Sequence, residues 1–334
     1  MSDEAAAASA AAAVHPGAAV DEGGRRPLVV VGDVVWDVLI RTNAKLQRGG
    51  DTYGEVELAP GGSAANAAVW ARRCGLPTAF VGKVGRDRFG ALAEADLADE
   101  GVEAYLVRTD AHLTGTVAVW IDDEGQRSMV SGKGADHMLF PQELPRGLVE
   151  SGRHVHLSAW SFFDDPPRAA VRRAAQLARA QGATLSFDPG SFQMIESMGV
   201  DAFLDVSADL GFGVVFPNYD EGRALTGLEE PAAIAEALTD RYPGALVALK
   251  LDEDGALVRE PDGRATEIPP RNNRLVDATG AGDAFAGAFL SRWLRGADAA
   301  EAARFAVRVS EWVIEQVGAR APIDGRLRAV LARG

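Results

Sequence analysis

The sequence contains almost no cysteine: Cys74 is the only one among its 334 residues. One thiol cannot form a disulfide within the chain, so we expect a reducing, cytoplasmic setting. Cys74 lies on an apolar helical pattern, which indicates a small buried side chain rather than a nucleophile. The five histidines form no metal-ligand cluster in the sequence. His154 and His156 alternate along a probable strand, and we interpret them as packing or surface residues that share one face.

Basic residues are scarce relative to acidic ones. The chain has 34 Lys and Arg against 48 Asp and Glu, which gives a net charge of -14. A chain this acidic repels a phosphate backbone, so the composition argues against nucleic-acid binding. A small phosphorylated ligand remains compatible with the charge, because a bound metal ion can screen it locally.

Long apolar runs are missing as well, and no stretch reaches the length of a membrane span. Residues 1–26 are rich in alanine, but they include Asp3 and Glu4 and have no Lys or Arg before Arg25. A signal peptide begins with positive charge, so we expect this segment to be a disordered tail.

The remaining sequence alternates between probable strands and probable helices over 27–331. This alternation predicts an α/β fold with a central, mostly parallel sheet and helices on both faces. Two strand-rich inserts, around 41–60 and 104–133, do not fit that pattern, and we predict that they form a small lid sheet. The polar segment DDEG at 122–125 is predicted to be a turn within it. Ligands are expected at the carboxyl ends of the parallel strands.

The stretch DATGAGDAFAGAFL, 277–290, places a glycine-rich turn where a helix begins. Successive backbone amides and the helix dipole form an anion site there, which we assign to Gly280, Ala281 and Gly282. A Walker A loop is absent, and Phe285 stands where a dinucleotide fingerprint needs its third glycine. The further motifs of a protein-kinase glycine loop are also absent.

Asp283 follows this turn, in the first turn of the predicted helix. A carboxylate beside an anion site can accept the proton of a hydroxyl that attacks a γ-phosphate. We expect the helix N-terminus to keep Asp283 ionised at neutral pH. The alternative is that Asp283 is an ordinary acid that stabilises the start of a helix.

A second glycine-rich segment, PGGSAANAAVWARRCG, precedes a predicted helix. Gly61 and Gly62 would allow the close approach of a polyhydroxylated ligand, and the amide of Asn66 can both donate and accept. Asp37 follows Asp33 by four residues after the first strand, and carboxylates bind sugar hydroxyls well. Each of these features is also typical of loops and helix caps.

Together the two segments resemble the signatures of the ribokinase-like, PfkB-type family of carbohydrate kinases, at 60–90 and 277–290. The resemblance extends over about Pro27 to Ile323. It implies a ribokinase-like fold and an ATP-dependent sugar kinase with Asp283 as its base. The positions that match the sugar site of the family are Asp37, Gly61, Gly62 and Asn66.

The resemblance also assigns nucleotide and metal positions. Asn218 and Glu221 match an Asn-x-x-Glu element that helps to hold Mg²⁺ through water. The loop from Lys250 to Gly255 matches a nucleotide-binding loop, although many members of the family have glycine where this sequence has Asp252. The other reading of Glu221 is an acid in the first turn of a helix, and that of Lys250 is a solvated lysine.

Asp277 and Thr279 match positions that bind a monovalent cation such as K⁺ in many members. The rest of that site is expected from the loop at 318–322. Lid sheets pair to form homodimers in many members of the family, and the inserts here are long enough to do so.

Two other functions fit the same residues. A nucleoside kinase would need a base-stacking pocket, for which the candidates are Trp36, Trp160, Phe162 and Phe163. A sugar or nucleotide sensor would keep the fold without the chemistry. A sugar-acid substrate would need a cation in the pocket. We interpret the available cations as surface charges: Lys83, Arg86, Arg127 and Lys133.

Overall fold

The computed structural model describes residues 20, 24–45, 48–121, 127–271 and 274–332. Most of the predicted tail and all of the predicted turn at 122–125 lie outside these ranges. The first strand begins at Arg26, one residue inside the segment that the sequence assigned to the tail.

The larger of two sheets has nine strands, in the order β13-β12-β11-β10-β9-β8-β1-β4-β5. Its strands are β1 (Arg26–Val31), β4 (Thr78–Gly85), β5 (Glu103–Thr109), β8 (Gly152–Ser158), β9 (Thr184–Asp188), β10 (Val214–Val215), β11 (Leu246–Lys250), β12 (Ala256–Arg259) and β13 (Ala265–Ile268). The pairs from β11 to β5 are parallel, and β12 and β13 add an antiparallel edge. The prediction of a mostly parallel central sheet is confirmed.

Both faces of this sheet are covered, as the apolar character of its strands requires. In β1, Leu28 and Val30 pack into one core cluster, whereas Val29 and Val31 pack into the other. The alternation follows from the strand geometry, in which successive side chains point to opposite faces.

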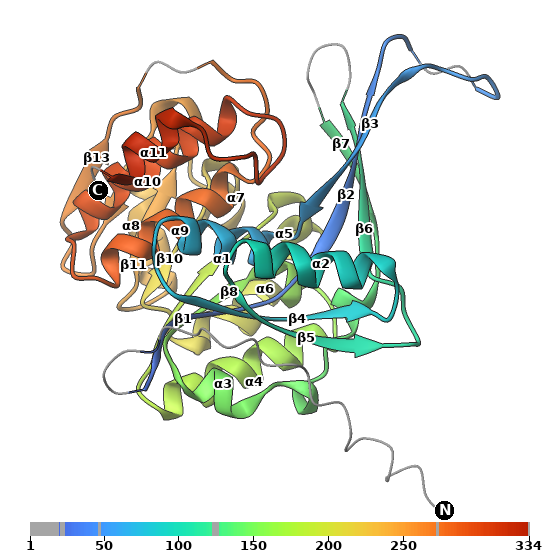
Figure 1. Ribbon diagram of the computed structural model, residues 1–334. Helices are drawn as coiled ribbons and strands as arrows, with labels where there is room; N and C mark the ends of the chain where they lie inside the picture. Colours follow the sequence, from blue (N-terminus) through green and yellow to red (C-terminus); the bar gives the residue numbers. More distant parts are fainter. Residues whose placement is uncertain (1–19, 21–23, 46–47, 122–126, 272–273, 333–334) are drawn as a thin grey trace, which may run out of the picture.

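The helices form one layer on each face (Figure 1). The first layer contains α1 (Ser63–Arg73), α2 (Arg88–Asp99), α9 (Ala281–Trp293), α10 (Ala299–Ile314) and α11 (Gly325–Ala332). The second contains α3 (Arg146–Glu150), α4 (Pro167–Ala180), α5 (Phe192–Met198), α6 (Val200–Ser207), α7 (Tyr219–Thr226) and α8 (Pro231–Arg241). The sequence pattern did not predict α3, α5, α6 or α11.

The smaller sheet rises beyond the helices in Figure 1, with its strands in the order β3-β2-β6-β7. Its strands are β2 (Val35–Thr42), β3 (Gly54–Gly61), β6 (Gly115–Ile121) and β7 (Arg127–Gly132). We call it the lid sheet. One part of the predicted insert is wrong, because β5 at Glu103–Thr109 pairs with β4 at the edge of the main sheet. Parallel pairing with β4 buries Leu106 in the main core, which the short segment alone did not indicate.

His154 and His156 on β8 are fully buried and share one face, where both contact the hydroxyl of Ser186 at 2.7 and 2.9 Å. Burial lowers the pKa of His154 to about 3 and that of His156 to about 4. The neutral rings are therefore packing residues. Cys74 is also buried, as predicted, and burial raises its pKa to about 12. Within the described ranges, no helix combines the length and apolar character that crossing a bilayer requires.

Candidate active site

The predicted site residues gather where the carboxyl ends of the parallel strands meet the start of α9. β1, β9, β10 and β11 end here, and the lid sheet joins the same edge through β2 and β3. Loops that follow parallel strands have no further sheet pairing to satisfy, so their side chains are available for ligands. Segments far apart in the sequence are thereby brought together in one place.

The turn before α9 adopts the conformation that its glycines allow. Gly280 has φ 74°, and a Cβ there would lie 2.4 Å from the Cβ of Ala319, so only glycine fits. Helix α9 begins without a side-chain cap, and the amide of Ala281 makes a long bond of 3.3 Å to the carbonyl of Ala278. The first-turn amides of Gly282 and Asp283 have no acceptor within the helix itself, and they are suited to an anion.

Asp283 accepts a hydrogen bond of 2.8 Å from Nδ2 of Asn66 on α1. The side chain is half-buried. Burial raises the pKa of Asp283 to about 7, the Asn66 hydrogen bond opposes that rise, and the Asp188 carboxylate adds to it. A pKa near neutrality disagrees with the expectation that the helix N-terminus keeps this group ionised at neutral pH, because desolvation is the largest influence on the carboxyl.

Lys250, at the end of β11, points into the same space. Its Nζ lies 2.5 Å from the carboxylate of Asp188 and 3.0 Å from where a Cβ on Gly282 would be. Its side chain is only 12% exposed, so it is not the solvated lysine of the alternative interpretation. The sequence analysis missed Asp188, whose signal is a single acid at the end of a buried strand before Pro189.

Asn218 and Glu221 form a capping box at the start of α7. The amide of Glu221 donates to Oδ1 of Asn218, and the amide of Asn218 donates to Oε2 of Glu221, both at 2.8 Å. Glu221 is only 2% exposed. Burial and the nearby Asp188 raise its pKa to about 8, while Lys250 opposes that rise. The capping interpretation of Glu221 is thus correct, and the same side chain also faces the site.

These residues fit Mg²⁺ held indirectly rather than in a closed protein cage. We call the first-turn amides of Gly282 and Asp283, together with the nearby ammonium of Lys250, the Gly282 cradle. The carboxylates of Glu221 and Asp188 lie near this cradle and can supply oxygen ligands. Among the described residues, no group of three or more His, Cys, Asp or Glu side chains is arranged to hold a metal. Mg²⁺ usually keeps several waters and binds one or two carboxylates together with substrate phosphates, which matches this donor set.

The predicted sugar-binding segment lies opposite Asp283. Gly62 is the N-cap of α1 with φ 94°, and Asp33 caps this helix by accepting from the amides of Ser63 and Ala64. Asp33 is therefore the cap acid that the alternative described. Asp37 on β2 lies against Gly61, where a Cβ would meet its carboxylate oxygens at 2.6 Å. Burial raises the pKa of Asp37 to about 6, and Arg320 opposes the rise.

Two residues in the loop after β11 have an unusual backbone conformation. Asp252 has φ 49°, a left-handed conformation that glycine adopts more readily. This conformation agrees with the resemblance noted above, because many members of that family have glycine at this position. A Cβ on Gly255 would lie 2.1 Å from the carbonyl oxygen of Ile268, so glycine is required for the turn into β12. A nucleotide contact for either residue remains a prediction.

Asp277 ties the turn before α9 to the loop after α10. Its Oδ1 accepts from the amide and hydroxyl of Thr279 at 2.9 and 2.6 Å, and its Oδ2 accepts from the amide of Gly318 at 2.9 Å. The loop at 318–322 is thus beside Asp277 and Thr279, where the cation-site prediction requires it. The same loop supplies Arg320, which the sequence analysis missed and which contacts Asn66.

The aromatic candidates for a base-stacking pocket are mostly packing residues. Trp36 donates through Nε1 to the carbonyl of Phe89 at 3.0 Å, and Phe162 is fully buried. Phe163 is 8% exposed. Trp160 is half-buried and packs edge-on against Phe163 with ring centroids 5.9 Å apart, so it is the candidate that stays partly open.

The predicted surface cations divide into two kinds. Lys83 is 4% exposed and bonds to Glu143 at 2.6 Å, so the interpretation as a surface charge is wrong for it. The ion pair with Glu143 explains how the ammonium is buried. Arg86 and Lys133 are exposed and pair with Asp110 and Asp164. The side chain of Arg127 lies outside the described residues.

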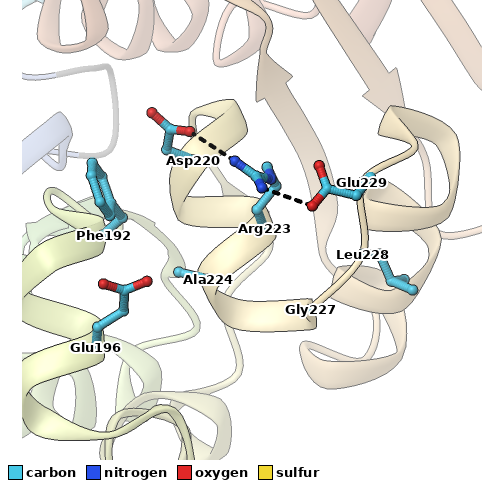
Figure 2. A pocket seen from close by; sticks show the side chains of 8 residues that line it. All are labelled: Phe192, Glu196, Asp220, Arg223, Ala224, Gly227, Leu228 and Glu229. Atoms are coloured by element: carbon cyan, nitrogen blue, oxygen red, sulfur yellow. Dashed lines mark hydrogen bonds and ion pairs between the residues drawn. The ribbon is translucent and has the colours of Figure 1, made fainter.

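A pocket of about 230 Å³ lies on another side of α7, between that helix and α5 (Figure 2). Arg223 crosses it between Asp220 and Glu229, and Phe192 and Leu228 form part of its wall. None of the predicted site residues lines this pocket, so it is separate from the arrangement around Asp283.

Comparison with known proteins agrees with this geometry. Residues 25–326 match the model of the pfkB family carbohydrate kinases. The chain is 31% identical to the ATP-dependent ribose-1-phosphate kinase of Halopiger xanaduensis over 90% of the chain and 96% of that protein. It is also 31% identical to a fructokinase of Escherichia coli, over 78% of the chain and 82% of that protein.

Solved structures share the fold. The adenosine kinase of Sinorhizobium meliloti superimposes with a TM-score of 0.83 at 24% identity, covering 92% of this chain and 99% of that one. Ribokinase of Arabidopsis thaliana, complexed with ribose and ATP, gives 0.76 at 24% identity and covers 92% of this chain and 99% of its own. The fold is therefore ribokinase-like, and the chain belongs to the pfkB family of carbohydrate kinases.

Proposed function

We propose that the protein transfers the γ-phosphoryl group of ATP to a hydroxyl of a small sugar or sugar acid. The observation that carries this proposal is the position of Asp283. It lies in the first turn of α9, bonded through one oxygen to Asn66 at 2.8 Å, and Lys250 lies beside the adjacent Gly282. A carboxylate next to both a polar segment and a candidate anion site supports a role as the base.

Asp283 accepts the proton of the attacking hydroxyl. Asn66 binds its Oδ2, which leaves Oδ1 for the hydroxyl of the substrate. Burial places the pKa of Asp283 at about 7, close to neutral pH, where a general base is most effective. Asp37 and the second amide hydrogen of Asn66 are the groups that we expect to orient the sugar hydroxyls.

The amides of Gly282 and Asp283 and the ammonium of Lys250 stabilise negative charge on the transferring group. Asn218 and Glu221 would hold Mg²⁺ through water at this edge. When bound, Mg²⁺ screens the phosphates of ATP and so reduces their repulsion from an acidic site. Asp277 and Thr279 remain the proposed monovalent-cation positions.

The lid sheet would close over the sugar and exclude water, which limits the hydrolysis of ATP. We also propose that two copies of the chain pair through this sheet. Val56, Leu58 and Val130 are 68%, 51% and 72% exposed on strands β3 and β7 of the lid sheet. Apolar side chains grouped on an uncovered sheet mark an interaction surface.

A sugar is favoured over a nucleoside as the substrate. Of the aromatic candidates for base stacking, Phe162 is completely buried and Trp36 is held by the carbonyl of Phe89. Only Trp160 among them is left to line a base pocket, whereas polar acceptors for hydroxyls surround Asp283.

The decisive experiment measures ADP production with ATP and Mg²⁺ across a panel of pentoses, hexoses, sugar acids and a purine nucleoside. Asp283→Asn should abolish turnover and preserve sugar binding. Asp298→Asn is the matched control, because Asp298 also stands at a helix start, where it caps α10 outside the site. Unchanged turnover in Asp283→Asn would refute the mechanism, and binding without turnover in the wild type would indicate a sensor.

A further inference from the structure

Arg320 lies in the loop between α10 and α11, with a side chain only 2% exposed. Its guanidinium contacts three separate elements. Nε donates to Oδ1 of Asn66 on α1 at 2.7 Å, and Nη2 donates to the carbonyl of Gly61 at the end of β3 at 3.2 Å. Nη1 forms an ion pair with Asp96 on α2. A buried charge satisfied from three directions is held in one orientation.

The contact with Asn66 determines which way its amide faces. An arginine side chain only donates hydrogen bonds, so the atom of Asn66 that faces Arg320 must be the carbonyl oxygen. The NH₂ group is then directed to the carboxylate of Asp283, which it contacts at 2.8 Å. If the amide of Asn66 were rotated by 180°, its NH₂ group would face the NH groups of Arg320, and its carbonyl oxygen would face the carboxylate of Asp283. Both contacts would then be repulsive.

The backbone of the loop is anchored as firmly as its side chain. Trp70 donates through Nε1 to the carbonyl of Ala319 at 2.9 Å, and Arg73 donates to the carbonyls of Ala321 and Arg320 at 2.9 and 3.2 Å. Ala319 also packs against Gly280 at the start of α9. The guanidinium is therefore fixed relative to both helices that carry Asn66 and Asp283.

We propose that Arg320 is a positioning residue for the reaction: it orients the amide of Asn66, and through that amide it holds the carboxylate of Asp283 toward the substrate. This proposal rests on the proposed role of Asp283 as the base. Among the described interactions, Arg320 forms no hydrogen bond or ion pair with Asp283, although the two charges act on each other, and Arg320 transfers no proton.

Removal of Arg320 should also change the electrostatic surroundings of Asp283. The ionisable groups that act on Asp283 come from the end of β1, from β9, α7, β11 and the loop itself: Asp33, Asp188, Glu221, Lys250 and Arg320. Three of these are acids and two are basic. Loss of the guanidinium and of the directed Asn66 donor therefore favours the protonated carboxyl.

The test compares Arg320→Met and Arg320→Lys with Arg26→Met. Arg26 is the matched control, because it is a 21%-exposed arginine in an ion pair with Glu103, but it stands at the start of β1 and does not bond the loop at 318–322. We expect Arg320→Met to lower kcat on the order of 10- to 100-fold. The acidic limb of its pH–kcat profile should move to higher pH, with little change in KM for ATP. Arg320→Lys should recover part of the loss, and Arg26→Met should lower Tm without moving the acidic limb.

Two further measurements separate this proposal from the proposed function. Carboxyl ¹³C NMR titration reports the pKa of Asp283 without any turnover, and the pKa should be higher in Arg320→Met than in the wild type. If Arg320→Met does not fold, Asp96→Asn, which loosens the guanidinium from its far side, should shift the same pKa in the same direction.

A double-mutant cycle supplies the final check, because the Arg320→Lys effect should largely vanish in an Asn66→Ala background. An unchanged pKa of Asp283 in the folded variants would overturn the positioning role even if the protein is a kinase. An undiminished effect in Asn66→Ala would do the same. Absence of turnover with every substrate would instead refute the proposed function and leave the NMR result to decide the role of Arg320.

Discussion

The ammonium of Lys250 lies 2.5 Å from the carboxylate of Asp188, at the ends of two strands separated by β10. Both side chains are almost buried, at 12% and 11% exposure. The pair brings a positive charge to the Gly282 cradle in a chain with a net charge of -14. Asp188 holds Lys250 in place by this ion pair, and the positive charge of Lys250 favours the binding of an anion at that edge of the sheet.

Lys250→Met should therefore cost both stability and activity. The change leaves Asp188 buried without its partner, which typically destabilises a protein by about 3 kcal/mol or more. We also expect KM for ATP to rise, because the cradle loses its cation. Urea unfolding and steady-state kinetics measure the two effects. Lys133→Met is the control, since its pair with Asp164 is 67% and 38% exposed and should contribute less than about 1 kcal/mol.

The half-buried carboxyl of Asp283 should make stability depend on pH in a definite direction. Its pKa is raised to about 7 in the folded chain, against about 4 when unfolded. Between these values the folded state retains a proton that the unfolded state releases, so this group lowers the free energy of unfolding as pH rises from 4 to 7. Asp283→Asn should therefore be more stable than the wild type at pH 8, on the order of 1–3 kcal/mol, and nearly equal to it at pH 4. Equal differences at both pH values, measured by urea unfolding, would contradict the raised pKa.

Gly61→Ala should impair the sugar site selectively. The new Cβ would lie 2.6 Å from the carboxylate oxygens of Asp37 and displace them. We expect KM for the sugar to rise roughly tenfold, equivalent to about 1.4 kcal/mol, with KM for ATP unchanged. Gly147→Ala serves as the control, because no atom lies within 4 Å of its added methyl. A rise in both KM values would show that Asp37 does not act on the sugar alone.

The lid sheet should mediate dimerisation. The double substitution Val56→Lys and Val130→Lys places charges on the exposed apolar strands and should shift the wild-type dimer to monomer in sedimentation velocity. Leu92→Lys, at a 49%-exposed position on α2, should leave the dimer intact. A monomeric wild type, or a dimer that resists the double substitution, would place the interface elsewhere.

The sequence predicts the parts of this structure that depend on local patterns. Apolar strands and periodic helices identified the central sheet and most of its helices, and the glycine-rich turn before α9 identified the start of the site. Asp283 and Asn66 were singled out because each stands in or beside such a turn, and Asp37 because it follows the first strand four residues after Asp33. Strand β5 was misplaced because a short strand carries no sign of which sheet it will join.

Other features depend on contacts that no local pattern records. Arg320 and Asn66 are 254 residues apart, and nothing around Arg320 in the sequence indicates its partner. The pKa of Asp283 is raised chiefly by burial, which depends on segments distant in the sequence, so the helix start alone could not predict it. In the sequence, the only indication of Asp188 is that it is a single acidic residue at the end of a strand.

The anchoring of the loop at 318–322 also has a consequence for protein synthesis. Trp70, Arg73 and Asn66 leave the ribosome long before the residues that hold them, since Ala319 to Ala321 follow about 250 positions later. A nascent chain that has not reached Gly318 has no guanidinium to set against Asn66 and no methyl to pack on Gly280. The site is therefore completed only after the loop at 318–322 has been made, and a chain that stops before this loop would lack an ordered base.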